Sequence, residues 1–182
     1  MGDTVLISGQ LVTARDKAHQ HLFNERPDPE ELPFNLAGSL IYHCGPIVIK
    51  DNSEYRVVAC GPTTSARVEM YEPWVIEKYG VRAVMGKGGM GIKTLDALKK
   101  HGAVYLHTIG GAASYLAEKV KSVITVFKLE EFGVPEAMWL IDVEGFPAIV
   151  TMDSHGNSLH ETIRKDSEKV YHRLLSPGHN KR

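Results

Sequence analysis

Residues 81–91 read Val81-Arg-Ala-Val-Met-Gly86-Lys87-Gly88-Gly89-Met90-Gly91, and this stretch decides the fold. An apolar run typical of a strand stops at four glycines and one lysine, and a helix is expected directly after it, over residues 92–100. The order of strand, glycine turn and helix directs backbone N–H groups and the positive end of a helix dipole at one point. Because Lys87 adds a full positive charge there, the stretch predicts an anion-binding turn.

Length and composition indicate one globular domain. The 182 residues are 43% hydrophobic and 24% charged, and their net charge of −1 does not indicate a nucleic-acid-binding protein. No apolar run reaches the roughly 18–20 residues that span a membrane, and the N-terminus does not resemble a secretion signal. We therefore expect a cytoplasmic chain, with a single domain over residues 1–175 and a flexible tail over residues 176–182.

The two cysteines limit the redox chemistry of the chain. Cys44 and Cys60 both precede Gly-Pro, and without a secretion signal we expect reduced thiols, although the two could pair in space. An iron–sulfur cluster generally needs three or four cysteine ligands, so this chain cannot hold one by itself.

The order of elements predicts an α/β fold with a mixed sheet. Thr13 is expected to cap a helix over residues 14–23, and the front of the chain resembles antiparallel or mixed sheet. Three strand–loop–helix units follow, and they imply a parallel sheet whose polar loops gather beyond the carboxyl ends of the strands. The strands of these units are expected to end at Cys60, Met85 and His107, followed by further strands over residues 123–127, 136–142 and 146–152 and a partly helical segment over residues 158–175.

Two nucleotide-binding motifs compete for the glycine loop, and both fail. Gly86-x-Gly88-x-x-Gly91 matches the dinucleotide fingerprint, but the acid expected about 20 residues later is absent. The phosphate-loop pattern needs a lysine directly after its second glycine, and Ile92 stands there instead. Tight packing would explain the glycines but not a lysine among them, so we favour a small anion.

A second loop, Gly61-Pro-Thr63-Thr64-Ser65-Ala-Arg67, offers three hydroxyls and one arginine. Ordinary helix capping explains one hydroxyl but not all three together with Arg67. Arg15 falls in the first turn of its expected helix, where the dipole disfavours a cation, so it either forms a surface ion pair or faces a ligand. Three charge-assisted hydrogen bonds from Arg15, Arg67 and Lys87, at about 1.5–3 kcal/mol each, would suffice for micromolar to millimolar binding of a dianion.

The nine histidines give no convincing metal pattern. The pairs His19 with His21 and His155 with His160 lack the spacing and converging acids of a metal site, so solvated or capping roles are expected. His43 and His107 end strands near the predicted site, and each could contact a ligand or be a satisfied buried histidine.

Four motifs occur in the same order in one known family. They are Thr13-Ala-Arg15-Asp16-x-Ala18-His19, Ile41-Tyr-His-Cys-Gly45-Pro46, Gly61-Pro-Thr-Thr-Ser-Ala-Arg67 and Val84-Met-Gly86-Lys87-Gly88-Gly89-Met90. The chain resembles, over nearly its whole length, the β subunit or C-terminal domain of class I iron–sulfur fumarases and L-tartrate dehydratases. This resemblance implies a swivelling β/β/α domain, which agrees with a mixed front and a parallel middle.

The resemblance also implies a reaction and a division of labour. The reaction is the reversible hydration of fumarate to malate, or alternatively the dehydration of tartrate, with a 4Fe-4S cluster held by a partner α subunit. Arg15, Arg67, Lys87, Thr64 and Gly88 resemble ligands of the substrate carboxylates, and Thr63 resembles the group that moves a proton. The chain would hold no metal itself, would be inactive alone, and would form a higher-order hetero-oligomer, or a homodimer when isolated. A stand-alone anion-binding module is the alternative from another class.

Overall fold

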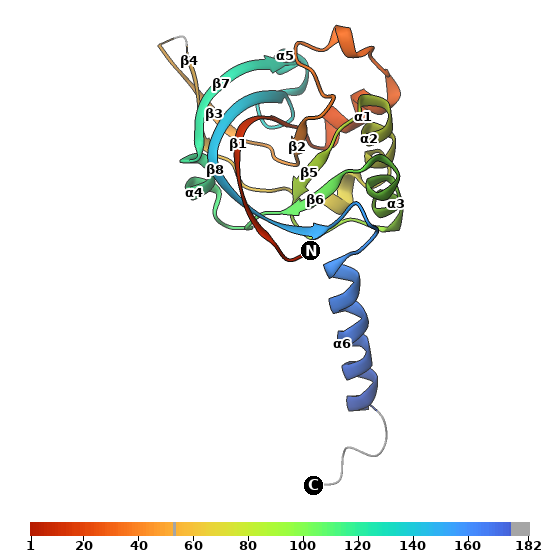
Figure 1. Cartoon of the computed structure of the whole chain (residues 1–182). Coiled ribbons are helices and arrows are strands. Elements are labelled where there is room, and N and C mark those ends of the chain that lie inside the picture. Colours follow the sequence, from red (N-terminus) through yellow and green to blue (C-terminus); the bar gives the residue numbers. More distant parts are fainter. Residues whose placement is uncertain (53, 176–182) are drawn as a thin grey trace.

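The fold is built on a ladder of strands that returns to its first member (Figure 1). The computed structural model describes residues 1–52 and 54–175. Strands β1 (Thr4–Thr13), β2 (Leu40–Tyr42), β5 (Ala83–Gly86) and β6 (Val104–His107) run parallel in that order. Strand β8 (Met138–Met152) pairs antiparallel with both β6 and β1, which closes the ladder, and β7 (Val120–Phe127) pairs with β8 from outside.

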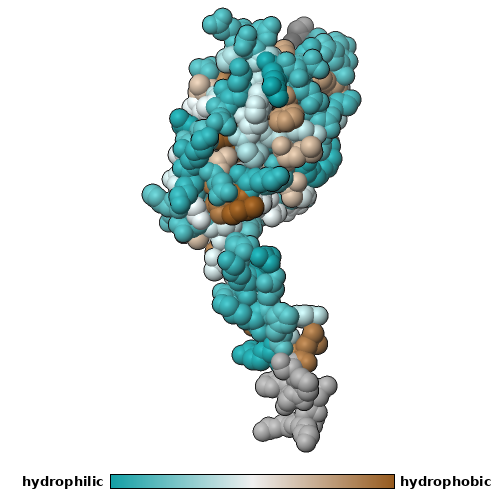
Figure 2. All heavy atoms as spheres, turned by 90° about the vertical axis from the view of Figure 1, so that its right-hand side faces the viewer, coloured by the Kyte–Doolittle hydropathy of each residue, from teal (hydrophilic) through white to brown (hydrophobic). Residues whose placement is uncertain are grey.

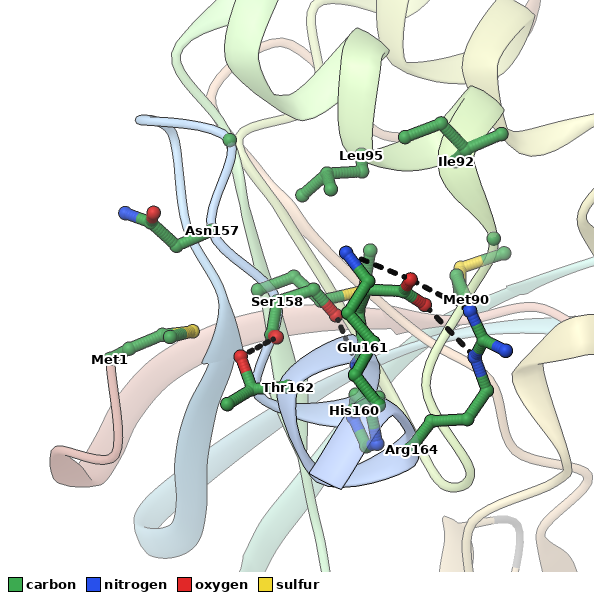
Figure 3. Close-up of a pocket in the computed structure, with 14 residues that line it drawn as sticks. Met1, Met90, Ile92, Leu95, Asn157, Ser158, His160, Glu161, Thr162 and Arg164 are labelled. Carbon is green, nitrogen blue, oxygen red and sulfur yellow. Dashed lines mark hydrogen bonds and ion pairs between the residues drawn. The ribbon is translucent and has the colours of Figure 1, made fainter. Parts of the chain in front are cut away.

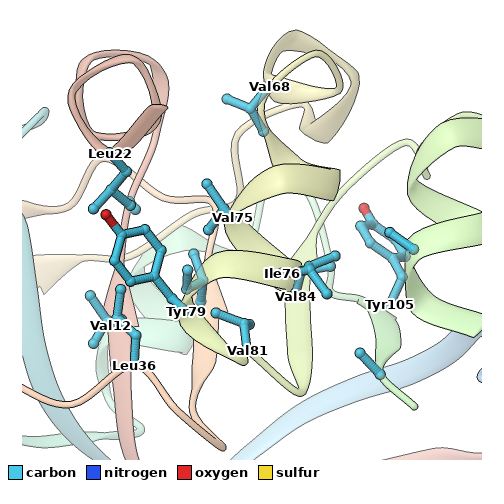
Figure 4. Packing of buried hydrophobic residues seen from close by; sticks show 14 of the residues in the cluster. Val12, Leu22, Leu36, Val68, Val75, Ile76, Tyr79, Val81, Val84 and Tyr105 are labelled. Atoms are coloured by element: carbon cyan, nitrogen blue, oxygen red, sulfur yellow. The ribbon is translucent and has the colours of Figure 1, made fainter. Parts of the chain in front are cut away.

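Alternate residues of the parallel strands serve two hydrophobic cores, as the period of a strand requires. Val12, Ile41, Val84 and Tyr105 belong to the cluster shared with helices α1 (Asp16–Asn24), α2 (Glu72–Tyr79) and α3 (Ile92–His101), part of which Figure 4 shows. Their neighbours Leu11, Tyr42, Met85 and Leu106 belong to the cluster on the opposite face. The sheet is therefore buried on both sides.

The opposite face is covered by a separate hairpin of β3 (Ile47–Asp51) and β4 (Glu54–Ala59) and by the short helix α4 (Ala113–Ala117). Tyr55 of the hairpin packs edge-on against buried Trp139 of β8. The prediction that the strand ending near Cys60 opens a parallel unit is therefore wrong, because the turn after Asp51 folds that strand back on β3 and β2 takes the parallel position.

Two further expectations need correction, and one predicted strand takes an orientation that the sequence leaves open. Thr13 does not cap helix α1, because its Oγ1 accepts a hydrogen bond from the Trp139 backbone, and the helix begins at Asp16. The expected turn at residues 143–145 does not divide β8; the strand runs through it, with Gly145 at φ +62°. Strand β7 is confirmed as a strand but is antiparallel to β8, since only the short helix α5 (Leu129–Phe132) and a turn connect the two.

The last described element is helix α6 (Leu159–Leu175), which extends away from the body of the molecule (Figures 1 and 2). None of its residues is buried, and Figure 2 shows it as mostly hydrophilic. Two 3-10 turns, η1 (Pro29–Glu31) and η2 (Ser65–Val68), complete the secondary structure. Within the part of the chain that is described, no helix is long and apolar enough to cross a bilayer. The predicted tail over residues 176–182 lies outside the described residues.

Truncating a buried side chain of β8 tests whether this strand packs into the core as the closed sheet requires. Phe146 is fully buried and packs edge-on against Tyr42, whereas Ile149, three residues along the same strand, is 38% exposed. We expect Phe146→Ala to lower the free energy of unfolding by about 3–5 kcal/mol, because it removes a buried ring and leaves a cavity. Ile149→Ala should cost well under half of that. Urea denaturation followed by tryptophan fluorescence measures both, and equal losses would contradict the packing described.

Candidate functional site

The carboxyl ends of the four parallel strands gather the predicted loops at one edge of the sheet, as expected for parallel strands. Arg15 follows β1, Gly45 follows β2, Lys87 follows β5, and residues 108–111 follow β6. The glycine at position 45 is required by a close approach: a Cβ there would overlap the guanidinium of Arg15 and the carbonyl oxygen of Pro135. The sequence prediction that polar loops meet at this edge is therefore confirmed.

The loop of residues 61–67 joins this edge although its strand, β4, lies in the separate hairpin. The Thr63 amide donates to the His43 carbonyl oxygen at 2.7 Å, and the Lys87 amide donates to the Thr63 carbonyl oxygen at 3.3 Å. The Ser65 amide donates back to the Lys87 carbonyl oxygen at 3.0 Å. These three hydrogen bonds place residues 63–65 next to the ends of β2 and β5. The loop of residues 61–67 and the glycine loop of residues 86–91 are therefore joined by backbone hydrogen bonds.

Arg15 and Arg67 are brought together by one carboxylate. Oδ2 of Asp16 lies 2.7 Å from an Nη atom of Arg67 and 3.4 Å from Nε of Arg15, and Nε of Arg15 also lies 2.9 Å from Oε1 of Glu136. The ion pair expected as one possibility for Arg15 is thus present. Asp16 and Glu136 are carboxylates that the sequence interpretation did not include, and they offset part of the positive charge of the two arginines.

Lys87 differs from the two arginines in its surroundings. It is half-buried, and among the described residues no carboxylate pairs with it. Its stem passes the backbone of Gly110, where a Cβ would sit 3.5 Å from Cδ. Thr64 and Gly88 flank it and are exposed. Because a cation held in a partly buried position without a counter-ion attracts anions, Lys87 is the most available positive charge of this edge.

The helix that follows the glycine loop already holds an anion. Oε2 of Glu69 accepts a hydrogen bond from the Gly91 amide at 2.8 Å and from the Thr94 hydroxyl at 2.9 Å, and Oε1 accepts from the Thr94 amide at 3.2 Å. The expectation that the N-terminus of α3 faces a bound ligand is therefore wrong, because Glu69 caps it. The glycines serve close packing: Gly88 and Gly89 take positive φ values, and a Cβ on Gly86 would overlap the Ser65 hydroxyl.

A cluster of buried polar side chains lies beneath the loops. Oε2 of Glu72 lies 2.9 Å from Nε2 of His19 and 2.9 Å from Nε2 of His43, and all three side chains are essentially inaccessible. Sequence reasoning predicted a solvated or capping role for His19, which is wrong, and it did not single out Glu72. For His43 the alternative of a satisfied buried histidine is confirmed.

The charges of this cluster follow from its geometry. Burial alone would raise the pKa of Glu72, but the two imidazoles outweigh it and hold that pKa at about 2. Burial alone would lower the pKa of His19, but the charge and hydrogen bond of Glu72 raise it overall. Burial prevails at His43, whose pKa is lowered. The ionised carboxylate of Glu72 therefore lies between two imidazoles, of which His19 is the more readily protonated.

Neither the cysteines nor the histidine cluster provides a complete site for a metal group. Cys44 and Cys60 are free, buried thiols with their sulfur atoms 3.7 Å apart, and burial raises the pKa of Cys44. Two thiols are too few for an iron–sulfur cluster. The group His19, His43 and Glu72 is the one set among the described residues with converging ligand atoms, but it is three ligands whose distances are those of N–H···O hydrogen bonds.

A hollow of about 720 Å³ opens on another side of the glycine loop, between α3 and the start of α6 (Figure 3). Met90, Ile92 and Leu95 line it together with His160 and Arg164. His160 donates to or accepts from the Thr151 hydroxyl at 3.0 Å, and its ring lies 5.7 Å from that of His107. None of the predicted substrate-binding residues lines this hollow, so it is separate from the edge that carries Lys87.

Comparison with known proteins identifies the family. Residues 1–163 match the family described as Fumarase C-terminus, and the chain belongs to that family. A protein of Geobacillus stearothermophilus, provisionally named fumarate hydratase class I, is 54% identical over 178 residues; the match covers 97% of this chain and 34% of the relative, so this chain spans about a third of its length.

Two similar relatives are named as subunits. A protein of Methanocaldococcus jannaschii, provisionally named L(+)-tartrate dehydratase subunit beta, is 45% identical over 96% of this chain and 88% of its own length. The L(+)-tartrate dehydratase subunit beta of Escherichia coli K12 is 40% identical over 87% of this chain and 78% of its own length. The family resemblance drawn from the four motifs is confirmed.

The low pKa of Glu72 has a measurable consequence at acid pH. Between the ordinary value of 4.5 and about 2, the unfolded chain binds a proton at Glu72 and the folded chain does not, so stability present above about pH 4.5 is lost as the pH falls toward 2. We expect the carboxyl ¹³C resonance of Glu72 to remain that of a carboxylate at about pH 3.5, where exposed glutamates are largely protonated. Titration of Glu72 together with the exposed glutamates would contradict the assigned cluster.

Proposed function

We propose that this chain is the β subunit of a fumarase-type hydro-lyase and supplies the substrate-binding half of an active site shared with an α subunit. The observation that carries this proposal is Lys87, a half-buried cation without a carboxylate partner among the described residues, on the same edge as the Arg15–Asp16–Arg67 cluster. The family and the names of the relatives, a hydratase and two dehydratase subunits, support the reaction class.

The proposed role of the cations is to clamp a small dicarboxylate. Lys87, with Thr64 and the backbone of Gly88 beside it, would bind one carboxylate, and Arg67 and Arg15 the other. Each charge-assisted bond contributes about 1.5–3 kcal/mol, but the two arginines already serve Asp16 and Glu136. A substrate carboxylate would therefore share or replace the contact between Arg67 and Asp16, which is the more exposed of these ion pairs.

Thr63 is the residue that we propose to move a proton at the substrate carbon. Its backbone is fixed on both sides, by the bonds to His43 and Lys87, which holds residue 63 next to the loop that carries Lys87. A threonine hydroxyl has no useful basicity at neutral pH, and neighbouring positive charges favour its alkoxide form. We propose that Lys87 and the arginines supply that stabilisation.

The cofactor belongs to the partner in this proposal. Since the described part of this chain has only two thiols to offer, a 4Fe-4S cluster would be held by the α subunit, where it would act as a Lewis acid on the substrate. The exposure of Thr64 and Arg67 supports an open half-site that a second subunit covers. We further propose that residues 1–175 form one domain of the swivelling β/β/α type and that the enzyme is cytoplasmic.

Tartrate dehydration is the second candidate reaction. It is favoured by the two relatives named as tartrate dehydratase β subunits, because this chain covers most of their length. Malate and tartrate are both four-carbon hydroxydicarboxylates, so the same clamp would serve either. Assay of the assembled enzyme with both substrates separates the two reactions.

Replacing Lys87 tests the clamp. In the enzyme assembled anaerobically with its iron-loaded partner, Lys87→Ala should lower kcat/KM for fumarate by about ten- to a hundredfold, because it removes a charge-assisted bond of about 1.5–3 kcal/mol from a partly buried site. Lys93→Ala, which removes an exposed lysine from helix α3, is the matched control and should leave kcat/KM within about twofold of the wild type.

Two results would contradict the proposal. Near-normal kinetics of Lys87→Ala, with the wild-type complex active, would remove Lys87 from the site. The pure chain without its partner should not hydrate fumarate, and activity of that chain without iron would overturn the shared site.

A further inference from the structure

The buried cluster beneath the site continues as a chain of hydrogen bonds. Nδ1 of His43 lies 2.9 Å from the Ser65 hydroxyl, which in turn lies 2.9 Å from the Tyr105 hydroxyl. At the other end, Nδ1 of His19 lies 2.8 Å from the carbonyl oxygen of Arg15. Five side chains, from α1, η2, α2 and β6 and from His43 directly after β2, thus form one connected path, and all five are buried.

The partners of His19 fix the protons at one end of this path. The Arg15 carbonyl and the ionised Glu72 carboxylate are acceptors only, so His19, placed between them, must donate from both ring nitrogens and is an imidazolium. His43 donates from Nε2 to Glu72, and burial lowers its pKa, which favours the neutral ring. In that form Nδ1 accepts from the Ser65 hydroxyl, which leaves Ser65 to accept from Tyr105.

Three residues of this path also form hydrogen bonds with segments of the proposed clamp. His19 holds the Arg15 carbonyl, and the His43 carbonyl holds the Thr63 amide. The Ser65 amide donates a hydrogen bond to the Lys87 carbonyl oxygen. Three loops that carry substrate-binding residues therefore share one buried support.

The contribution of the buried path to the stability of the fold is only a weak reason for its presence. A buried ion pair is often no more stabilising than well-packed apolar side chains, because both charges must leave water. Here Oε1 of Glu72 is buried and has no hydrogen-bond partner within the described part of the chain, which adds to the cost. Where such groups are retained, fixing a single arrangement is a known use of them.

We propose that Glu72 and His19 are positioning residues, which lock the loops of Arg15, Thr63 and Lys87 into one arrangement through a charged, directional hydrogen-bond path. The link to substrate binding rests on the proposed function above. Glu72 orders the path because its carboxylate keeps both ring nitrogens of His19 protonated and sets the tautomer of His43.

Two substitutions at position 19 separate this role from simple packing. The amide nitrogen of asparagine can take the place of Nδ1 and keep the bond to the Arg15 carbonyl, whereas that of glutamine can take the place of Nε2 and keep only the bond to Glu72. In the assembled enzyme we expect His19→Gln to raise KM about tenfold or more, with kcat changed less. His19→Asn should raise KM by less than about threefold. Equal effects of the two on KM, or effects only on protein yield and Tm, would overturn positioning through Arg15.

A spectroscopic measurement on the chain itself makes the test independent of activity. In ¹⁵N-labelled wild-type protein at about pH 7.5, both ring nitrogens of His19 should show the shifts of an imidazolium, and in Glu72→Gln one of them should lose its proton. A neutral His19 in the wild type would overturn the path as assigned, even if the assembled enzyme is active. If that spectrum is as expected and the wild-type complex nevertheless neither hydrates fumarate nor dehydrates tartrate, the proposed function fails and the path stands.

Discussion

Strand β8 pairs on both of its edges, and this double pairing determines where the loops of the site lie. Its first half runs between β1 and β7, and its second half runs between β1 and β6. Because β1 and β6 are the outer members of the parallel group, β8 holds both of them and closes the ladder. The carboxyl ends of four parallel strands are thereby kept at one edge, and each ends in a loop that carries a polar or charged group.

At that edge the N-terminus of α3 and both arginines already bind carboxylates of the protein itself. Glu69 occupies the N-terminus of α3, and Asp16 and Glu136 accompany the two arginines. Lys87 is left as the half-buried cation without a carboxylate partner among the described residues. The protein thus binds its own carboxylates at three of the positive positions, and in the proposed function the selectivity for an external dicarboxylate would rest on Lys87 and on competition for Arg67.

Much of this arrangement follows from local sequence patterns, and the rest does not. The apolar run before Gly86 and the hydroxyls before Arg67 locate the two loops correctly, because strand periodicity and turn chemistry act over a few residues. Glu69 lies 22 residues from Gly91, and Glu72 lies 53 residues from His19. Partners so far apart in the chain have no local signature, so neither carboxylate could be assigned from the sequence. The sequence predicts two strands in place of β8 because Glu144-Gly145 is typical of a turn. In the structure the pairing of β8 with two neighbouring strands overrides that turn preference.

A crystal structure of the assembled complex with malate bound would show whether this chain contributes the dicarboxylate clamp of a shared active site. We expect one malate carboxylate within hydrogen-bond distance of Nζ of Lys87 and the other in contact with Arg67, with Thr63 facing the carbons between them. Malate bound entirely by residues of the partner subunit, with the contact between Arg67 and Asp16 unchanged, would contradict this expectation.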